Sequence, residues 1–404
     1  MLGAPPCQQL WDALQSFAER VKAKGLEVQR GKSACWRPDG GAIDGKPVDL
    51  PIGTPGHYGF EVVGETREAR AEGLCVYNVP IGTAAFVQGY LHSKAARIGG
   101  NFSKLQAKLQ PVSHAHYLWT SLYYSASRQF DFWLRNSFPR DVEPHAVELD
   151  GKLVAAVSAA WQVDVRSCTR ALRRLRLPVR CKGGGIRDLA ELCHSAFVGG
   201  LAASLPYFLD GYDADGRRVR TGLFPGLVHV FGDRAYADGE EEALAQFVSI
   251  GSPTAVALAE SWAELQRLAG LPALAEDIEA EADVCEALRL PVAVGAAHPT
   301  VRRKGQHTLT LAVERHAFRT LDAEFRALPN DHRERWLWQA LDESSRGWLL
   351  TLPDSIGRLE SRELAEVAAR YFFLPSPALQ PFVGKRVMVA GAREVTCRPY
   401  GDEL

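Results

Sequence analysis

The chain has 404 residues, of which 46% are hydrophobic and 24% are charged, and its formal net charge is −1. This composition is typical of a soluble globular protein, and the length is sufficient for two or three domains with a sizeable core. A net charge near zero excludes a protein that attracts polyanions over its whole surface. Any attraction to nucleic acid or to a membrane must therefore come from a local patch.

The amino-terminal sequence MLGAPPCQQLWDAL predicts no signal peptide, because it has neither a basic region nor a long apolar region. No stretch reaches the roughly eighteen consecutive apolar residues of a membrane span, so we expect no membrane partner. Eight cysteines are scattered along the chain without a CxxC pair. This pattern favours buried, reduced thiols in a cytoplasmic or nuclear protein.

The first 81 residues predict a mixed segment of α and β structure. Residues 8–24 have the apolar spacing of an amphipathic helix, and Gly25 is typical of the position after a helix end. Short alternating or apolar stretches then predict four strands. They lie at residues 26–29, 32–36, 60–63 and 74–79.

From residue 82 onward the pattern is mostly helical. A first helix is predicted from apolar residues that keep a helical period, namely Phe86, Tyr90, Leu91, Ile98, Phe102, Leu105 and Leu109. A second is expected over 113–134. We therefore predict an α+β fold that is mostly α, with a palm-like segment at 1–81, a thumb-like helical region at 82–210 and a further helical region at 211–404.

The junction between strand 74–79 and the first long helix has a predicted geometry. Pro80 cannot donate a ladder hydrogen bond, so we expect it to end the strand. Gly82 could adopt a positive φ that a residue with a side chain would resist. We expect the Pro80–Gly82 stretch to fix the angle between strand and helix.

Two segments carry a family resemblance. FAERVKAKGLEVQRGKSACW and GLCVYNVPIGTAAFVQGYL together resemble the end of the palm and the start of the thumb in reverse transcriptases of non-LTR retrotransposons. The family pattern GLxLNxxK(S/T) is matched at Gly25, Leu26, Val28, Lys32 and Ser33, with Gln29 in place of the usual Asn. The second family pattern, G(I/L)xVLGxP(I/V)G, is matched at Gly73, Val76, Pro80, Ile81 and Gly82.

The resemblance continues downstream of the thumb. LPVRCKGGGIRDLAELCHSAFVGGLAASLP and RGWLLTLPDSIGRLESRELAEVAARYFFLP are similar to two later segments of long retroelement polyproteins from protists and algae. All four segments stand in the family's order and extend over nearly the whole chain.

The resemblance implies a relative of RNA-directed DNA polymerases in which Lys32 is the palm lysine. In the family, two Mg²⁺ ions are held by palm aspartates upstream of the GLxLNxxK pattern. Only 24 residues precede Gly25 here, and Asp12 is their one aspartate. We therefore expect a reverse-transcriptase-derived fragment without polymerase activity or cofactor, unless another chain or upstream segment supplies the aspartates and hence Mg²⁺.

Two acidic motifs are similar to a polymerase metal motif but fit it poorly. YADG, at 236–239, lacks the second carboxylate of Tyr-Ala-Asp-Asp, and YDADG, at 212–216, has its carboxylates two residues apart. Surface turns explain both motifs. His114 and His116 would point from different faces of a helix, and Cys397 stands without a second cysteine nearby, so no metal site is predicted from them.

The strongest charged feature is VRSCTRALRRLRLPVRCKGGGIR at 165–187, which has eight basic residues and no acidic one. The predicted nucleic-acid contacts are Arg166, Arg170, Arg173, Arg174, Arg180 and Lys182. The first four are expected on one helix stripe that suits a phosphate backbone, with the KGGG amides close to a phosphate. The partner would be RNA, DNA or an RNA–DNA hybrid. Two alternatives remain open: a solvated basic face, and a helical protein-interaction or scaffold module that binds no nucleic acid.

Overall fold

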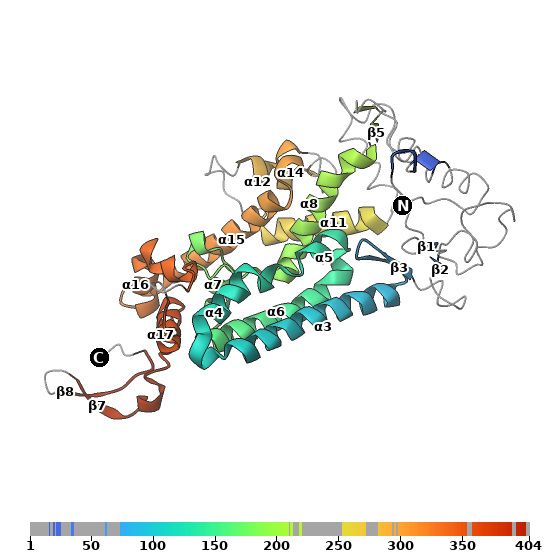
Figure 1. Ribbon diagram of the computed structural model, residues 1–404. Coiled ribbons are helices and arrows are strands. Elements are labelled where there is room, and N and C mark those ends of the chain that lie inside the picture. Colours follow the sequence, from blue (N-terminus) through green and yellow to red (C-terminus); the bar gives the residue numbers. More distant parts are fainter. Residues whose placement is uncertain are drawn as a thin grey trace. The chain divides into compact units, whose positions relative to one another are not determined.

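The computed structural model describes residues 73–209, 253–271, 282–292, 298–353, 358–389 and 393–400, with isolated shorter stretches elsewhere. It divides into two compact units, residues 1–93 and 94–404. The boundary falls inside the long helix α3 (Ala84–Leu109), which is continuous across it. The fold is α+β and mostly α, as predicted (Figure 1).

The first unit contains two small sheets. Strands β1 (Ala34–Cys35) and β2 (Glu61–Val62) pair in parallel, and both lie where strands are predicted. The described residues of the predicted first helix, between 16 and 23, are helical, and Gly25 follows with a φ of +76°. The predicted strand 26–29 and Lys32 lie outside the described residues.

The predicted strand 74–79 spans most of the first strand, the turn and the first residue of the second strand of a β-hairpin. Strand β3 (Gly73–Val76) pairs with β4 (Val79–Gly82), so that Cys75 lies opposite Pro80. Tyr77 and Asn78 form the turn with φ values of 49° and 67°, the left-handed conformation of a two-residue hairpin. Pro80 therefore lies inside a strand, and the positive φ that we expected at Gly82 is at the turn instead.

The second unit begins with helices that follow the predicted order with different breaks. After α3 come α4 (Pro111–Tyr124), the short 3-10 helix η2 (Ala126–Arg128) and α5 (Asp131–Asn136). The single helix predicted over 113–134 is thus three pieces. Helix α6 (Pro139–Trp161) begins with a proline, which is favourable at a first helical position, and ends at Gln162 in the left-handed conformation.

The remaining elements complete the second unit. They are η3 (Val165–Ser167), α7 (Thr169–Arg176), η4 (Val179–Cys181), α8 (Leu189–Leu209), β5 (Gly211–Tyr212), β6 (Arg218–Val219), α11 (Pro253–Leu268), α12 (Ala282–Arg289), α14 (Pro299–Lys304), α15 (Gln306–Ala327), α16 (Arg333–Ala340), η5 (Ser344–Leu349), α17 (Ser361–Tyr371), η6 (Gln380–Phe382), β7 (Arg386–Val389) and β8 (Arg393–Thr396). Strands β5 and β6, and β7 and β8, form antiparallel pairs.

Helix α8 lies at the centre of this packing and contacts α5, α6, α11 and α15 (Figure 1). A hydrophobic cluster that includes Val198, Leu258, Trp262 and Leu309 joins α8, α11 and α15. Helices from the predicted 82–210 and 211–404 regions therefore share one core. The structure divides into two units, and the three-part division stays a prediction from the sequence.

A second packing centre is aromatic. Trp161 at the end of α6 stacks on Phe372, with ring centroids 4.8 Å apart, and lies 4.7 Å from Trp119 of α4. The Trp119 indole N–H donates to the Leu349 carbonyl at 3.0 Å. This cluster fixes the carboxy-terminal helix α17 against α4 and α6. Five cysteines are described, without a disulfide among them; Cys193 and Cys397 are buried and Cys75 is exposed.

Candidate anion-binding pocket

A pocket of about 670 Å³ lies in the second unit between α5, the end of α7, α8 and the start of α15. We call it the cationic pocket, because its lining includes six basic side chains. They are Arg128, Arg135, Arg176, Arg180, Arg187 and Lys304. Glu314 is the one carboxylate among the lining residues. This imbalance of charge in a concave site favours an anionic ligand.

Three of the basic side chains have carboxylate partners. Arg176 lies 2.9 Å from Asp150 and 3.5 Å from Asp188. Arg180 lies 2.7 Å from Glu314. The contact between Arg187 and Asp131 is longer, at 3.9 Å. These pairs hold the arginines in place and neutralise part of their charge.

The other three have no ion pair with a carboxylate in the part of the chain that the structure describes. Arg128 is on η2, Arg135 is on α5 and Lys304 ends α14. Arg135 donates through Nε to the side-chain oxygen of Gln306 at 2.7 Å, which is a neutral partner. Burial raises the pKa of Asp131 and of Glu314, and the nearby charge of Arg128 opposes this shift at both carboxyls, as that of Arg135 does at Asp131. The charge of the two arginines is thus partly offset, and the rest is available to a ligand.

The start of helix α15 adds to the positive potential. Gly305 precedes the helix with a φ of +48°, and no side chain caps the first turn. Gln306 and His307 line the pocket. Amides in the first turn of a helix have no acceptor within the helix, and the helix dipole places partial positive charge at this end. A 22-residue helix thus begins at the wall of a pocket that basic side chains already line.

Arg174 does not take the role that the sequence suggested. Its side chain is fully buried, and the guanidinium lies 4.1 Å from the Tyr371 ring and 4.6 Å from the Phe373 ring. It donates to the carbonyls of Lys182 and Tyr371. Burial lowers its pKa to about 10. Arg174 is therefore part of the core and cannot contact a phosphate at the surface.

The other predicted contacts are mostly paired inside the protein. Arg166 is on η3, not on the α7 stripe, and pairs with Asp164 at 3.0 Å. Arg170 and Arg173 pair with Glu334 and Glu324 at 2.6 and 2.7 Å. Lys182 donates to the Trp338 carbonyl at 2.8 Å. Of the six predicted residues, Arg180 lines the cationic pocket.

The glycines of KGGG have a packing role that differs from the expected phosphate contact. The amides of Gly183, Gly184 and Gly185 donate to the carbonyls of Pro178, Arg174 and Leu177. A Cβ at Gly183 would lie 2.0 Å from the Leu177 carbonyl oxygen, and one at Gly184 would lie 2.6 Å from Leu175. Only glycine allows this approach, and the amides are not free for an anion.

Sequence reasoning missed Arg128, Arg135 and Lys304. Arg128 and Arg135 are isolated in the sequence, and only the breaks between α4, η2 and α5 bring them to one wall. The run VRRKG before the α15 pattern was a usable signal for Lys304, because a basic run and a glycine directly before a helix are typical of an anion site.

The imidazole of His116 connects two parts of the second unit. His116 is buried on α4, where its Nε2 lies 3.0 Å from the Thr351 carbonyl and its Nδ1 accepts from the Leu359 amide at 3.0 Å. Burial lowers its pKa. Both ring nitrogens thus have structural partners that connect α4 to the chain before α17.

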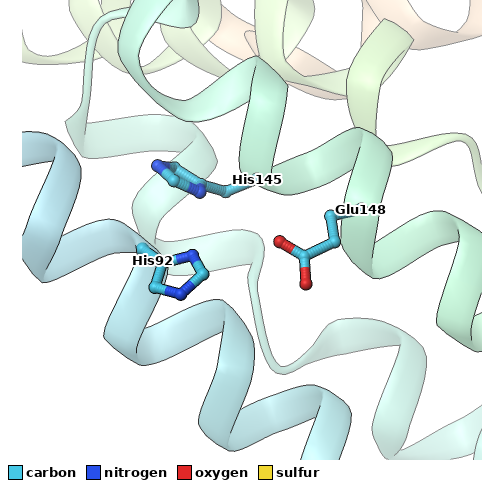
Figure 2. Close-up of side chains that lie close together, drawn as sticks. All are labelled: His92, His145 and Glu148. Atoms are coloured by element: carbon cyan, nitrogen blue, oxygen red, sulfur yellow. The ribbon is translucent and has the colours of Figure 1, made fainter.

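Three further side chains have donor atoms of the kind that bind metal ions. Figure 2 shows His145 and Glu148, three residues apart on α6, and His92 on α3. The Glu148 carboxylate accepts a hydrogen bond from Lys152 at 2.6 Å. His92 belongs to the first unit and the other two to the second. Because the units are not placed relative to each other, we assign no joint site to the three.

The remaining motifs from the sequence lie mostly beyond the described residues. The YADG motif at 236–239 is outside them, and so are Asp213 and Asp215 of YDADG. Tyr212 ends the short strand β5.

No protein-family model, curated protein or solved structure matches the chain. Among the helices that the structure describes, none combines the length and the apolar character that crossing a lipid bilayer requires.

Proposed function

We propose that the chain is a nucleic-acid-binding protein and that the cationic pocket is its phosphate-binding site. The observation that carries the proposal is the group of Arg128, Arg135 and Lys304 around the uncapped start of α15, three cations that form no ion pair with a carboxylate of the described residues. Guanidinium, ammonium and helix amides are the groups that bind phosphate oxygens in proteins.

The sequence resemblance supports nucleic acid as the source of the phosphate. A chain related to the palm and thumb of a reverse transcriptase would hold RNA, DNA or an RNA–DNA hybrid. The proposal concerns binding and not polymerisation, and we assign the pocket no Mg²⁺-dependent step. A cytoplasmic or nuclear location is consistent with such a partner and remains a prediction.

The test is a binding titration with fluorescein-labelled single strands and an RNA–DNA hybrid, followed by anisotropy at several salt concentrations. The variant carries Arg128→Gln, Arg135→Gln and Lys304→Gln together. Each lost contact to a single-strand phosphate reduces the slope of log K against log salt by about 0.7. We therefore expect the triple variant to bind more weakly, with a slope flatter by about 2.

Arg166→Gln is the matched control. Arg166 belongs to the same basic segment but is exposed, pairs locally with Asp164 and does not line the pocket. We expect its slope and affinity to equal those of the wild type. A protein that binds none of these nucleic acids at about 0.1 M salt, or a triple variant that binds as well as the wild type, would overturn the proposal. The first result would favour the scaffold alternative.

A further inference from the structure

A second pocket, of about 240 Å³, adjoins the cationic pocket. The two share Arg176, Arg187, Thr310 and Glu314 in their linings. We call the second one the apolar pocket, because six of its fourteen lining residues are aliphatic. Those side chains are Leu172, Leu177, Leu192, Val313, Ala317 and Leu321.

The aliphatic walls belong to the core of the second unit. Leu177, Leu192 and Leu321 are all less than 5% exposed. The volume is below the roughly 300 Å³ at which pockets for drug-sized ligands begin. The apolar pocket therefore suits one flat ring system and not a base pair or an aliphatic chain of lipid length.

Three carboxylates, those of Asp188, Glu191 and Glu314, line the apolar pocket, and they differ in their partners. Glu314 lies 2.7 Å from Arg180. Asp188 accepts from the amides of Ala190 and Glu191 and lies 3.5 Å from Arg176, so its oxygens have partners. The Glu191 carboxylate has no hydrogen bond or ion pair with a described residue. Ser195 and Thr310 are paired with each other at 2.8 Å. Glu191 is therefore the acceptor that remains for a ligand.

We propose that the apolar pocket receives one nucleobase with an exocyclic amino group, whose amino N–H donates to the Glu191 carboxylate. This inference rests on the proposed function, because the phosphate of the same nucleic acid would lie in the adjoining cationic pocket. A carboxylate accepts from the amino group of cytosine, adenine or guanine. Uracil and thymine have a carbonyl oxygen in place of this amino group, which a carboxylate repels, and their one donor at this edge is the ring N3–H.

The experiment compares two RNA ten-mers of equal charge, oligo(C) and oligo(U), by anisotropy at pH 7.5. Their phosphates are the same. Their bases differ at position 4, amino against carbonyl, and at position 3, where cytosine has an acceptor nitrogen and uracil an N–H. We expect wild-type protein to bind oligo(C) about five- to tenfold more tightly than oligo(U), the effect of one base-edge hydrogen bond. We also expect equal salt slopes, because both strands offer the same phosphates.

Two variants test the pocket itself. Glu191→Gln removes the charge that accepts from the amino group, and Ala317→Phe fills the apolar space; each should reduce the oligo(C) to oligo(U) ratio to about one. Glu334→Gln is the matched control, since Glu334 pairs with Arg170 and neither residue lines a pocket. It should keep the wild-type ratio.

The two proposals fail in different ways. If oligo(C) and oligo(U) bind equally well and with a steep salt slope, the phosphate site stands and the base site is wrong. An unchanged ratio in both Glu191→Gln and Ala317→Phe also overturns the base site. If neither strand binds, both proposals are wrong.

Discussion

The carboxylate of Asp150 and the guanidinium of Arg176 lie 2.9 Å apart in a pair that connects the middle of α6 to the end of α7. Asp150 is 4% exposed, and its second oxygen accepts from the amides of Leu189 and Ala190 at the start of α8. Arg176 also donates to the Arg187 carbonyl at 2.8 Å. One buried carboxylate thus positions two helices and a basic side chain of the cationic pocket.

Replacing this carboxylate should destabilise the second unit strongly. Asp150→Ala leaves the largely buried Arg176 with the longer contact to Asp188 as its carboxylate partner, and it leaves the Leu189 amide without its acceptor. Removing one partner of a buried ion pair costs about 3–5 kcal/mol. The measurement is the free energy of unfolding in urea, followed by tryptophan fluorescence. Trp11 and Trp36 are in the first unit and the other seven tryptophans are in the second, so the signal reports mainly the second.

Glu148→Ala is the control for this prediction, because it breaks the exposed pair with Lys152 on the same helix. Exposed pairs contribute up to about 1 kcal/mol. Equal losses for Asp150→Ala and Glu148→Ala would show that Asp150 does not have the structural role that its contacts suggest.

Asp150 also leads to a prediction of how oligonucleotide binding depends on pH. Burial raises the pKa of Asp150 to about 7, although Arg176 lowers it. As the pH falls from 8 to 6, Asp150 gains a proton and a negative charge beside Arg176 is lost. Phosphodiester groups keep their charge over this range, so affinity for an oligonucleotide without a terminal phosphate should rise as the pH falls, by up to about fivefold for a contact of about 1 kcal/mol.

Asp150→Asn separates this effect from other titrating groups. The contribution of Asp150 is the difference between the wild-type response and that of Asp150→Asn. An identical pH response in the two proteins would contradict the prediction.

Removing the side chain of Arg174 should lower the free energy of unfolding far more than removing that of Arg166, although both residues belong to one basic segment. Arg174→Ala removes a buried guanidinium that contacts four aromatic rings and leaves the Lys182 and Tyr371 carbonyls without their donor. We expect a loss of about 3–5 kcal/mol in the free energy of unfolding. Arg166→Ala removes an exposed side chain and should change it by about 0.5 kcal/mol or less. Circular dichroism at increasing urea concentration measures both; a harmless Arg174→Ala would place the side chain at the surface.

The contrast between these two arginines shows what the sequence could predict. The spacing of apolar residues correctly predicts α3, as at Phe86, Leu91, Ile98 and Phe102. A helix buries one face, and apolar residues three or four positions apart indicate that face. The same rule places Arg174 among solvated arginines. It is wrong there because Tyr371, Phe372 and Phe373, about two hundred residues later, surround that position. Such partners leave no local signal.

The hairpin and the cationic pocket were missed for related reasons. Tyr77 is a residue type that rarely adopts a positive φ, so the sequence does not indicate a turn between β3 and β4. A single strand is therefore the simplest interpretation of 74–79. Arg128, Arg135 and Lys304 meet only because α8 and α15 approach closely. Composition and spacing predict the basic segment at 165–187. The position of the cationic pocket depends on which basic side chains already pair with carboxylates, and the sequence does not show this.

The approach of α8 to α15 depends on Gly199, and two glycine variants test it. A Cβ at Gly199 would lie 2.2 Å from the backbone nitrogen of Gln306, so Gly199→Ala must push the start of α15 away. We expect a net loss of about 1–3 kcal/mol in the free energy of unfolding, together with weaker oligonucleotide binding, because Gln306 and its neighbour His307 line the pocket.

Gly151, in the middle of α6, is the control, because no atom of another part of the chain lies within 4 Å of the corresponding Cβ. Gly151→Ala should therefore stabilise by about 0.5–1 kcal/mol, the helix preference for alanine, without affecting binding. Urea unfolding and anisotropy on the same two proteins give the comparison. If Gly199→Ala is as stabilising as Gly151→Ala, the two helices do not meet at this glycine, and the wall of the cationic pocket is not where the structure places it.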